Sequence, residues 1–518
     1  MTKTFGILHL SDRCIHKDGK KISKRFTSYD RNIGTLDIKT KKTAMHDIYC
    51  IVNIKEKCVE EYFESVNHNQ IPRLIAIANW KNLKNYNLNI ISKDITNSRT
   101  NLDIDNIISI DPTGSLDIDD AIHYRVIDNQ IEIGIHIADP TSYIDFESDL
   151  DKELQNRCSS VYFTNETIHM LPTELATNII SLKSDIEKRS FSLIIRFNTT
   201  NYNDIGELIK NGLYEYEFKK SIIKVKKNLS YDEAQKIIDS KEATNFNNYN
   251  KYNLNDLYQI ALEINKKYMI QFNDVHDMIA LYMILANNLC GLKLKDIPSI
   301  VRINYKKESN INIENKELLK LYNTCLQTKA IYTINNILDN TLDNSNVKHE
   351  GLNIENYAHF TSPIRRYQDM IIHRILYNHI QNQIQNQIQN ENIFDIKMEK
   401  LIELIDKINS QEVLYKFTSN IDKINQLLDD KNMIEIECKI IFIDIDSISV
   451  IYEEKNLMFK IDHVHYKLKD IVEKKINYDC IEIKLNDTIR IYRLFEKIKI
   501  KIYRLKLEKN LFKILITI

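Results

Sequence analysis

Four aspartates gathered within ten positions are the residues of this chain whose spacing best suits catalysis. They lie in the stretch DPTGSLDIDDAI and are Asp111, Asp117, Asp119 and Asp120. Carboxylates this close repel one another unless cations lie between them. Pro112 and Gly114 bend the chain after the first acid, which lets acids six residues apart converge. Hard oxygen ligands suit Mg²⁺ or Mn²⁺, and a pair of such ions commonly serves to cut a phosphodiester.

The same stretch has two other interpretations, a solvated acidic turn and a structural calcium loop. A helix–loop–helix calcium loop requires a Glu at its twelfth position. Counted from Asp111, that position holds Ile122, so the calcium interpretation fits poorly. These twelve residues alone leave the solvated turn and the catalytic metal site both open.

A second group of polar residues lies in GLNIENYAHFTSPIRRYQDMIIHRILY, residues 351–377. Pro363 after Ser362 is typical of a helix entry, with Pro in the first turn. Arg365 and Arg366 would then lie in that first turn, where the helix dipole already attracts anions. Two arginines there make sense if they grip a phosphate with paired hydrogen bonds. The alternative is a pair of surface arginines bound to acids.

Three further polar side chains are expected to be structural. Asp369 and His373 stand one helical turn apart, and we interpret them as a hydrogen-bonded pair. His136 follows the strand-like run IEIGI, and we expect it to be a satisfied core residue.

Hydrophobic patterning predicts the elements that position these residues. Short apolar runs within 107–200 (NIISI, AIHYRVI, IEIGIHIAD, SLIIRF) predict strands, with the aspartates between two of them. From about 231 the period is helical, opened by a capping box of Ser230 and Glu233. Residues 1–90 read as a small β-barrel and 91–106 as a linker, and strand patterns return at 434–518. The low-complexity run at 381–390 favours a surface helix or a flexible loop.

Near the C-terminus, lysines alternate with isoleucines in EKIKIKIYRLKL. The lysines on one face are Lys497, Lys499 and Lys501, and residues 431–518 carry 18 Lys/Arg against 14 Asp/Glu. One interpretation is an ordinary solvated strand face. The other is a barrel strand whose outer face contacts phosphates.

Composition bounds the class of protein. A chain of 518 residues with 43% hydrophobic and 28% charged residues predicts three or four globular domains. We expect no membrane span, because no apolar run has the necessary length, and no secretory signal. Eight scattered Cys without a CxxC pair argue against a zinc site or a disulfide framework and suit an intracellular setting, with the cytoplasm as the first expectation.

Together, the two constellations resemble the RNase II (RNB) family of 3′→5′ exoribonucleases, over roughly residues 100–420. DPTGSLDIDDAIHY is similar to the family's metal motif, and HEGLNIENYAHFTSPIRRYQDMIIHRIL is similar to its most specific signature. The flanks resemble the cold-shock-type and OB barrels of exosome-type members trimmed at the N-terminus. The resemblance implies an α+β fold, with a mixed sheet and helices flanked by small β-barrels. The implied domains are 1–95 (barrel), 96–428 (nuclease) and 429–518 (OB-like barrel).

The resemblance also implies roles for individual residues. Two Mg²⁺ ions (or Mn²⁺) would be held by the four aspartates, with Asp119 and Arg365 catalytic and Tyr162 stacking on the 3′-terminal base. Other implied RNA contacts are Ser362, Arg366, Lys497, Lys499 and Lys501. We therefore expect single-stranded RNA to be degraded processively to nucleoside 5′-monophosphates, by a monomer that has no membrane partner.

The chain departs from the family pattern in three places. Ala280 and Leu281 stand where members carry a Glu pair, one of which helps to read the ribose 2′-OH. Between Lys267 and Asp277 there is almost no room for the usual hairpin with its second stacking aromatic, and KFTSNIDK replaces a basic helix. These departures leave open a catalytically weakened RNA-binding member. A phosphohydrolase of small esters is a third hypothesis, although the barrel-like flanks argue against it.

Overall fold

The computed structural model describes most of the chain. The described residues are 3–12, 16–18, 21–30, 33–81, 83, 99–239, 254–270, 272–305, 329–335, 348–384, 396–443, 447–455, 457–462, 471–476, 480–485, 489–506 and 512–517.

The N-terminal sheet closes on itself. Its six strands are β1 (Lys3–Leu8), β2 (His16–Asp18), β3 (Lys21–Ser28), β4 (Thr35–Thr40), β5 (Ile48–Asn53) and β6 (Cys58–Phe63). They follow the order β1-β5-β6-β4-β3-β2, and β1 also pairs with β3, which joins the two sides into a small barrel. Phe26, Ile38 and Val52 fill its interior, where all three are fully buried.

A seven-stranded mixed sheet forms the centre of the molecule. Its strands are β7 (Thr100–Asn101), β8 (Ile108–Asp111), β9 (Asp120–Ile127), β10 (Gln130–Ala138), β13 (Glu187–Phe197), β14 (Glu215–Lys224) and β15 (Lys227–Ser230). The order is β15-β8-β9-β10-β13-β14-β7, with the two outermost pairs parallel and the others antiparallel. The strands expected around the aspartates are therefore confirmed.

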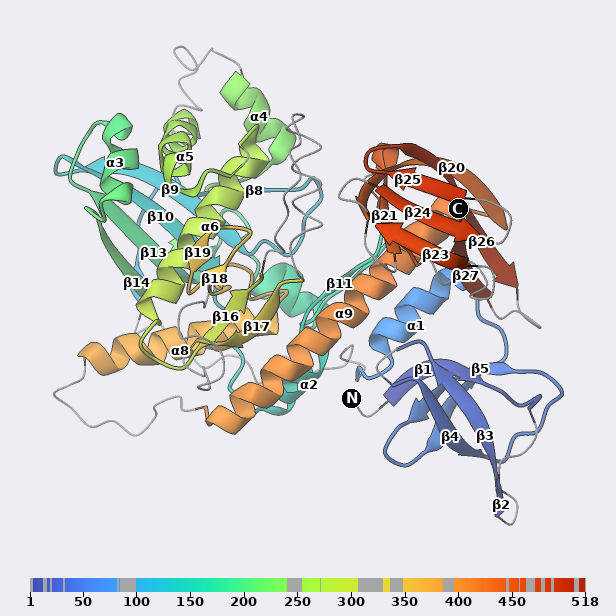
Figure 1. The fold of residues 1–518 in the computed structure, drawn as a ribbon. Helices are drawn as coiled ribbons and strands as arrows, with labels where there is room; N and C mark the ends of the chain where they lie inside the picture. Colours follow the sequence, from blue (N-terminus) through green and yellow to red (C-terminus); the bar gives the residue numbers. More distant parts are fainter. Residues whose placement is uncertain are drawn as a thin grey trace.

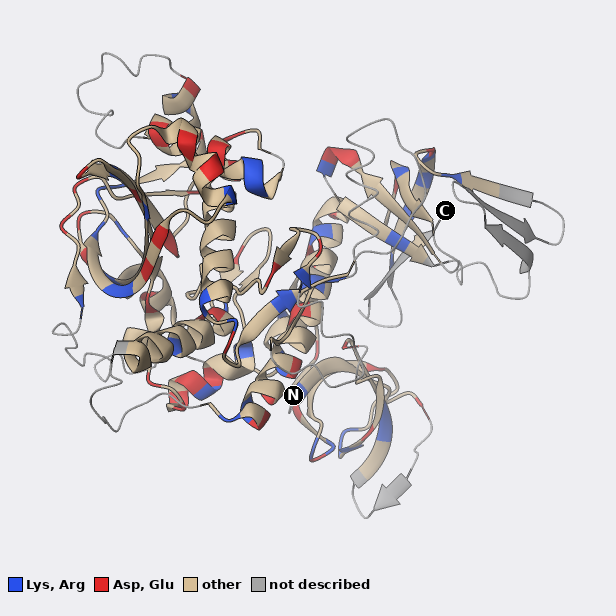
Figure 2. Cartoon of the chain, turned by 60° about the vertical axis from the view of Figure 1, so that its left-hand side comes forward, with Lys and Arg blue, Asp and Glu red and all other residues tan. Residues whose placement is uncertain are grey.

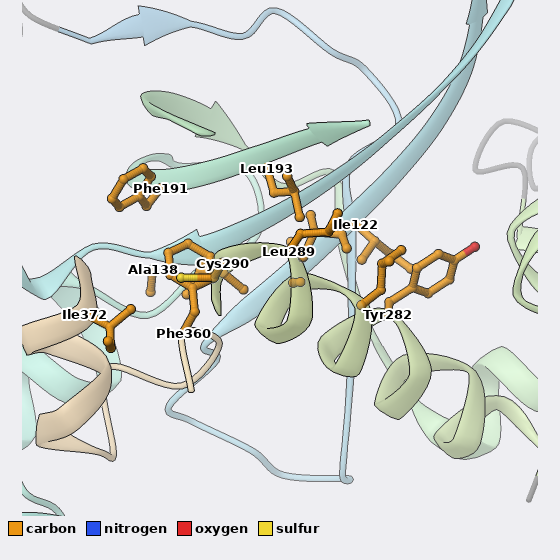
Figure 3. Packing of buried hydrophobic residues seen from close by; sticks show 14 of the residues in the cluster. Ile122, Ala138, Phe191, Leu193, Tyr282, Leu289, Cys290, Phe360 and Ile372 are labelled. Carbon is orange, nitrogen blue, oxygen red and sulfur yellow. The ribbon is translucent and has the colours of Figure 1, made fainter. Parts of the chain in front are cut away.

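The central strand β10 is covered on both faces. Every residue from Ile131 to Ala138 is buried, as expected for a strand with packing on each side. In Figure 3, Tyr282, Leu289 and Cys290 of α6 pack towards Ile122 and Leu193 of the sheet. Burial of this large apolar cluster holds the sheet against the helices that carry the second constellation.

His136 is a satisfied core residue, as predicted. It is fully buried, and its Nδ1 and Nε2 lie 2.7 Å from Ser192 Oγ and 2.8 Å from His123 Nδ1. Gly134 makes this arrangement possible, because a Cβ there would meet the His123 ring at 2.1 Å.

Helices surround the sheet and extend from it. They are α1 (Ile71–Ile77), α2 (Asp149–Arg157), α3 (Ile205–Lys210), α4 (Tyr231–Asp239), α5 (Leu254–Tyr268), α6 (Val275–Lys293), α8 (Tyr367–Ile384) and α9 (Met398–Leu428). The predicted capping box starts α4: Glu233 N donates to Ser230 Oγ, and Ser230 N donates to Glu233 Oε2. Figure 1 shows α9 running from the central region past α1 towards the C-terminal strands.

The C-terminal region is again β-structure. A five-stranded sheet has the order β22-β21-β20-β26-β27, and a second sheet joins β23, β24 and β25. The bounds are β20 (Met433–Ile443), β21 (Ser447–Tyr452), β22 (Leu457–Asp462), β23 (Ile471–Ile476), β24 (Cys480–Leu485), β25 (Ile489–Arg493), β26 (Lys497–Lys506) and β27 (Phe512–Thr517). The predicted α+β fold class is confirmed, whereas the domain boundaries 1–95, 96–428 and 429–518 stay a prediction.

Helices α8 and α6 bear on two expectations from patterning. In the low-complexity run, α8 continues through Ile384, and residues 385–390 lie outside the described residues. Among the described helices, α6 is long and apolar enough to cross a membrane by length and composition, which corrects the expectation that no such run exists. Of that window, 67% is buried inside the protein, as in the core helix of a globular domain.

Candidate active site

The four aspartates lie where two adjacent strands of the central sheet meet. Asp111 is the last residue of β8, and Asp120 is the first residue of β9. The loop between them turns sharply: Ser115 N donates to Pro112 O at 3.1 Å, and Gly114 has a φ of +84°, a left-handed conformation that favours glycine. The predicted bend therefore returns the chain, so that acids from both strand ends face one site.

Burial raises the pKa of several of these carboxyl groups and so favours their neutral form. It raises the pKa of Asp119 to about 7, although Arg365 and the Ile364 N–H act in the opposite direction. Burial likewise raises the pKa of Asp111 to about 6, and burial with the Asp111 charge raises the pKa of Asp120 well above its ordinary value. Oδ2 of Asp111 and Oδ2 of Asp119 are buried without a hydrogen-bond donor. Such unsatisfied, mutually repelling oxygens fit a divalent cation.

The four carboxylates are spread more widely than the ligands of one ion. In the part of the chain that the structure describes, one set of three His, Cys, Asp or Glu side chains has ligand atoms within 4.8 Å of one another. That set is Asp274, His276 and Asp277, at the start of α6. Ligation by the four aspartates would therefore draw their side chains together. Asp111, Asp117 and Asp120 are only partly buried, whereas Asp119 is buried.

The second constellation contacts the acids directly. Ile364 N donates to Asp119 Oδ1 at 2.8 Å across 245 positions of sequence, and Arg365 Nε lies 3.3 Å from Asp119 Oδ2. Arg365 Nη2 donates to Ser362 Oγ at 2.9 Å, and its side chain keeps 42% of its surface exposed. The guanidinium is thus oriented beside the acids and still open to a ligand.

The helix after this segment begins later than predicted. It starts at Tyr367, so Pro363, Arg365 and Arg366 lie in a preceding turn and not in the first helical turn. Ser362 O accepts from both arginine N–H groups, and Arg366 forms an isolated β-bridge with Ser159. This strand-like pairing with Ser159, which follows α2, prevents the turn from adopting helical geometry.

Arg366 is enclosed by protein partners. Its Nη2 donates to Asp369 Oδ2 at 2.7 Å, its Nη1 lies 3.2 Å from His359 Nδ1, and its side chain is 17% exposed. The predicted pairing of Asp369 with His373 is wrong, because Asp369 binds Arg366 and the Ser362 N–H, while His373 Nε2 binds Phe360 O. For Arg366, the interpretation as an arginine bound to an acid fits better than a free phosphate contact.

Removing the Arg366 side chain should therefore destabilise the protein. Asp369 is fully buried and would lose its cationic partner, which typically costs about 3–5 kcal/mol. We expect Arg366→Ala to lower the urea midpoint strongly, with Arg365→Ala as the matched control that leaves it nearly unchanged. Equal midpoints for the two variants would refute the structural role of Arg366.

Tyr162 lies beside the acids and not in the core. It ends the short strand β11 (Val161–Tyr162), its hydroxyl donates to Asp117 Oδ2 at 2.9 Å, and 43% of its surface is exposed. The turn between β11 and β12 (Thr167–Ile168) is held from α9, because Thr164 N and Oγ1 both donate to Asp422 Oδ2 at 2.8 Å. An aromatic ring is thus presented at the site on a tethered hairpin.

Comparison with known proteins identifies the family to which this arrangement belongs. Residues 99–382 match the RNB domain, which is more than half of the chain. The chain belongs to the RNB domain family. Exosome complex exonuclease RRP44 of Homo sapiens is 28% identical over 467 residues, covering 76% of this chain and 46% of that protein. The chain thus spans about half the length of this curated relative.

Solved structures share the fold of this RNB protein. Mycoplasma genitalium RNase R, in complex with ribose-methylated single-stranded RNA, aligns with a TM-score of 0.68 and 16% identity, covering 99% of this chain and 89% of that one. Yeast Ssd1, described as a pseudonuclease, aligns with a TM-score of 0.70 and 13% identity, covering 99% and 82%. The predicted family and its flanked mixed-sheet architecture are confirmed.

The lysines predicted to face RNA lie on β26 of this RNB protein and pair with glutamates. Lys497 Nζ lies 2.7 Å from Glu437, and Lys499 and Lys501 lie 3.5 and 3.7 Å from Glu435 on β20. Figure 2 likewise shows acidic and basic residues interspersed over the described chain. The pairs offset the positive charge of this face, so a phosphate contact by these lysines stays a prediction.

The two positions at which the family resemblance implies glutamates, Ala280 and Leu281, lie on α6. Leu281 is fully buried in the core, and Ala280 is partly buried. Because these residues are alanine and leucine, neither position of this RNB domain offers a carboxylate. The connection from α5 to α6 spans only residues 269–274, and its described residues contain no strand.

The structure adds neighbours of the acids that sequence reasoning missed. His169 Nδ1 is buried without a hydrogen-bond partner, 3.7 Å from Asp117 Oδ2. Tyr231 lies next to the acids as well, and burial together with Asp120 and Asp111 raises its pKa to about 12. Neither residue belongs to one of the two constellations found in the sequence, so the three-dimensional proximity identifies them.

The raised pKa of Asp119 predicts how pH affects stability without divalent ions. Between its ordinary value near 3.8 and about 7, the folded protein keeps a proton that the unfolded chain has lost. Stability should therefore fall as pH rises through this window, and added Mg²⁺ should restore it. Thermal unfolding in EDTA measures the effect against Asp119→Asn, whose advantage over wild type should grow with pH. A constant difference between the two proteins would contradict the assignment.

Proposed function

We propose that this chain is a 3′→5′ exoribonuclease that shortens single-stranded RNA processively and releases nucleoside 5′-monophosphates. The observation that carries the proposal is the joining of the two constellations at Asp119, which accepts from Ile364 N and lies 3.3 Å from Arg365 Nε. Buried acids beside a half-exposed arginine provide an anionic floor and a phosphate-binding cation within one site.

Divalent ions would be held by the four aspartates. The unsatisfied oxygens of Asp111 and Asp119 are the strongest candidates among their ligand atoms. When bound, a pair of Mg²⁺ or Mn²⁺ ions would lower the pKa of the attacking water and neutralise charge on the phosphate.

The side chains of the site orient the substrate for an in-line displacement. Arg365 would donate to the phosphoryl oxygens where negative charge develops, and Ser362 holds its guanidinium in place. The exposed ring of Tyr162 would stack on the terminal base, which is worth about 1–3 kcal/mol and tolerates any sequence. The water oxygen bonds to phosphorus and the P–O3′ bond breaks. The shortened RNA takes a proton on its 3′-oxygen, and the phosphate leaves on the released nucleoside.

We propose single-stranded RNA as the substrate class. The name of RRP44 describes an exosome exonuclease, and the RNase R structure holds single-stranded RNA, which supports this class of substrate here. We also propose that the chain acts as a monomer inside the cell.

A 5′-labelled single-stranded RNA tests the function. With Mg²⁺ we expect the full-length RNA to be converted to short products that keep the label, with few intermediates because shortening is processive, and EDTA should abolish the conversion. A label released at once as mononucleotide would indicate the opposite direction, and intact RNA at all times would refute nuclease activity.

The second candidate is an RNA-binding member without turnover. The likeness to Ssd1, described as a pseudonuclease, and the loss of carboxylates at Ala280 and Leu281 favour it. Tight RNA binding that is unaffected by Mg²⁺, with no product, would decide for this candidate.

Weak sugar discrimination is expected if the enzyme is active. A carboxylate that accepts from the ribose 2′-OH would reject DNA, and neither Ala280 nor Leu281 supplies one. A single deoxyribose near the 3′ end of a labelled RNA should therefore slow the shortening past that position less than tenfold. This is the scale of one lost neutral hydrogen bond, about 1 kcal/mol. Arrest at the deoxyribose would contradict this expectation.

A further inference from the structure

A cavity of about 790 Å³ lies beside the acids, between α1 and the β11–β12 hairpin. Residues from three segments line it, namely 73–83, Arg157 and 166–174, and those used in the argument are Arg73, Trp80, Lys81, Arg157, Glu166 and His169. Its volume is within the range of small-molecule sites, roughly 300–1,000 Å³. None of the functional residues expected from the sequence lines it.

Hydrogen bonds fix the walls of the cavity. Arg157 donates through Nη1 to His169 O and Met170 O, and through Nη2 to Lys81 O, so one side chain joins both sides. Its guanidinium also lies over the Trp80 ring, 4.4 Å from the centroid. Lys81 N donates to Glu153 Oε1, which also accepts from Arg157. The cavity is therefore a formed site whose walls are held together without a ligand.

His169 connects the cavity to the catalytic acids. It lines the cavity, and its Nδ1 lies 3.7 Å from Asp117 Oδ2. That nitrogen is buried and has no hydrogen-bond partner among the described residues, so a ligand group that reached it would satisfy it. The cavity thus begins at the place where, under the proposed function, the terminal phosphate is released.

The charges lining the cavity suit one phosphate group. Arg73 is paired with Glu166 at 3.3 Å, and Arg157 is paired with Glu153. Lys81 is exposed and has no ion-pair partner among the described side chains. Trp80 adds a half-buried aromatic surface. Glu174 also lines the cavity and adds a carboxylate that no described cation pairs with. One available cation and one aromatic ring match the single phosphate and base of a mononucleotide, whereas the several phosphates of a longer RNA segment would meet this carboxylate and two arginines that are already paired.

We propose that this cavity binds the nucleoside 5′-monophosphate product, with its phosphate at Lys81 and its base near Trp80. The proposal rests on the proposed function for the identity of the nucleotide. It makes the cavity a product site, at which accumulated mononucleotide competes with release of the next one and slows the enzyme.

Trp80 is the only tryptophan of the chain, so its fluorescence reports on the cavity without any catalysis. In EDTA, titration of the full chain with UMP should change Trp80 emission saturably. Lys81→Glu should weaken binding at least tenfold, and Lys81→Arg should restore it. The matched control Lys210→Glu makes the same charge change at an exposed lysine that ends α3, outside the cavity lining, and should bind UMP as wild type does. Uridine and inorganic phosphate should each bind more weakly than UMP.

The outcomes separate this proposal from the nuclease proposal. UMP binding with the expected Lys81 dependence, in a protein that does not cut RNA, would support the cavity and reject the nuclease. An active nuclease without a UMP-dependent signal, or with one unchanged in Lys81→Glu, would overturn the cavity proposal alone. A signal produced by RNA oligonucleotides and not by UMP would also overturn it, since it would assign the cavity to the RNA path. In an active enzyme, UMP should slow RNA hydrolysis of wild type more than that of Lys81→Glu.

Discussion

Replacing Asp119 with Asn should abolish RNA hydrolysis, with a loss of at least about 10³-fold in turnover, the upper end of the effect of removing one transition-state contact. Asp119 is the acid on which the two constellations meet, and its Oδ2 is buried without a donor. Asn keeps the shape and the acceptor for Ile364 N but removes the charge that would hold a cation. Single-turnover cleavage of labelled RNA with saturating Mg²⁺ measures the change.

Binding and stability distinguish this effect from unfolding. Burial disfavours the charged form of Asp119, so in EDTA at neutral pH the thermal midpoint of Asp119→Asn should equal or exceed that of wild type. RNA affinity should stay within a few-fold of wild type. A variant that cuts RNA at a rate near wild type would remove Asp119 from the catalytic machinery.

Replacing Arg365 with Ala should slow hydrolysis by about 10²–10³-fold, because a preorganised donor to the developing phosphate charge is lost. The Arg365 side chain is 42% exposed, and its removal takes the ion-pair partner from Asp119. Asp119 keeps the Ile364 N–H and can take up a proton, because burial already raises its pKa to about 7, so the unfolding midpoint should change little. Single-turnover rates measure the loss of activity, and urea unfolding midpoints of the same variant show whether its stability has changed.

Arg365→Lys provides the matched variant. Lysine keeps the charge but loses the paired donors of the guanidinium, so it should recover only part of the rate. Full activity in Arg365→Lys would indicate that charge alone suffices, and full activity in Arg365→Ala would exclude the proposed role.

The sequence predicted the local part of the site well. Periodicity placed strands on either side of the aspartates, and Pro112 and Gly114 marked the turn between them. The capping box at Ser230 fixed the start of α4, because it depends on residues only three positions apart. The family resemblance then brought Asp119 and Arg365 together, although nothing in their spacing could have done so.

What the sequence missed depends on contacts between distant segments. The helix after Pro363 begins late because Ser159 pairs with Arg366, across more than 200 residues. Asp369 faces Arg366 and not His373, since a buried charge takes the strongest partner that packing offers. The lysines of β26 pair with glutamates on β20, some 60 residues earlier. Asp422 accepts a hydrogen bond from Thr164, in the hairpin that carries Tyr162, across 258 residues.

The identity of the released product in ¹⁸O-labelled water tests the central claim most directly. Single-stranded RNA is incubated with the protein and Mg²⁺, and the mononucleotides are analysed by mass spectrometry. Hydrolysis at the acids and Arg365 predicts nucleoside 5′-monophosphates with one solvent oxygen in the phosphate, and none from Asp119→Asn. Cyclic or 3′-phosphate products, products without solvent oxygen, or equal amounts from Asp119→Asn would contradict the account.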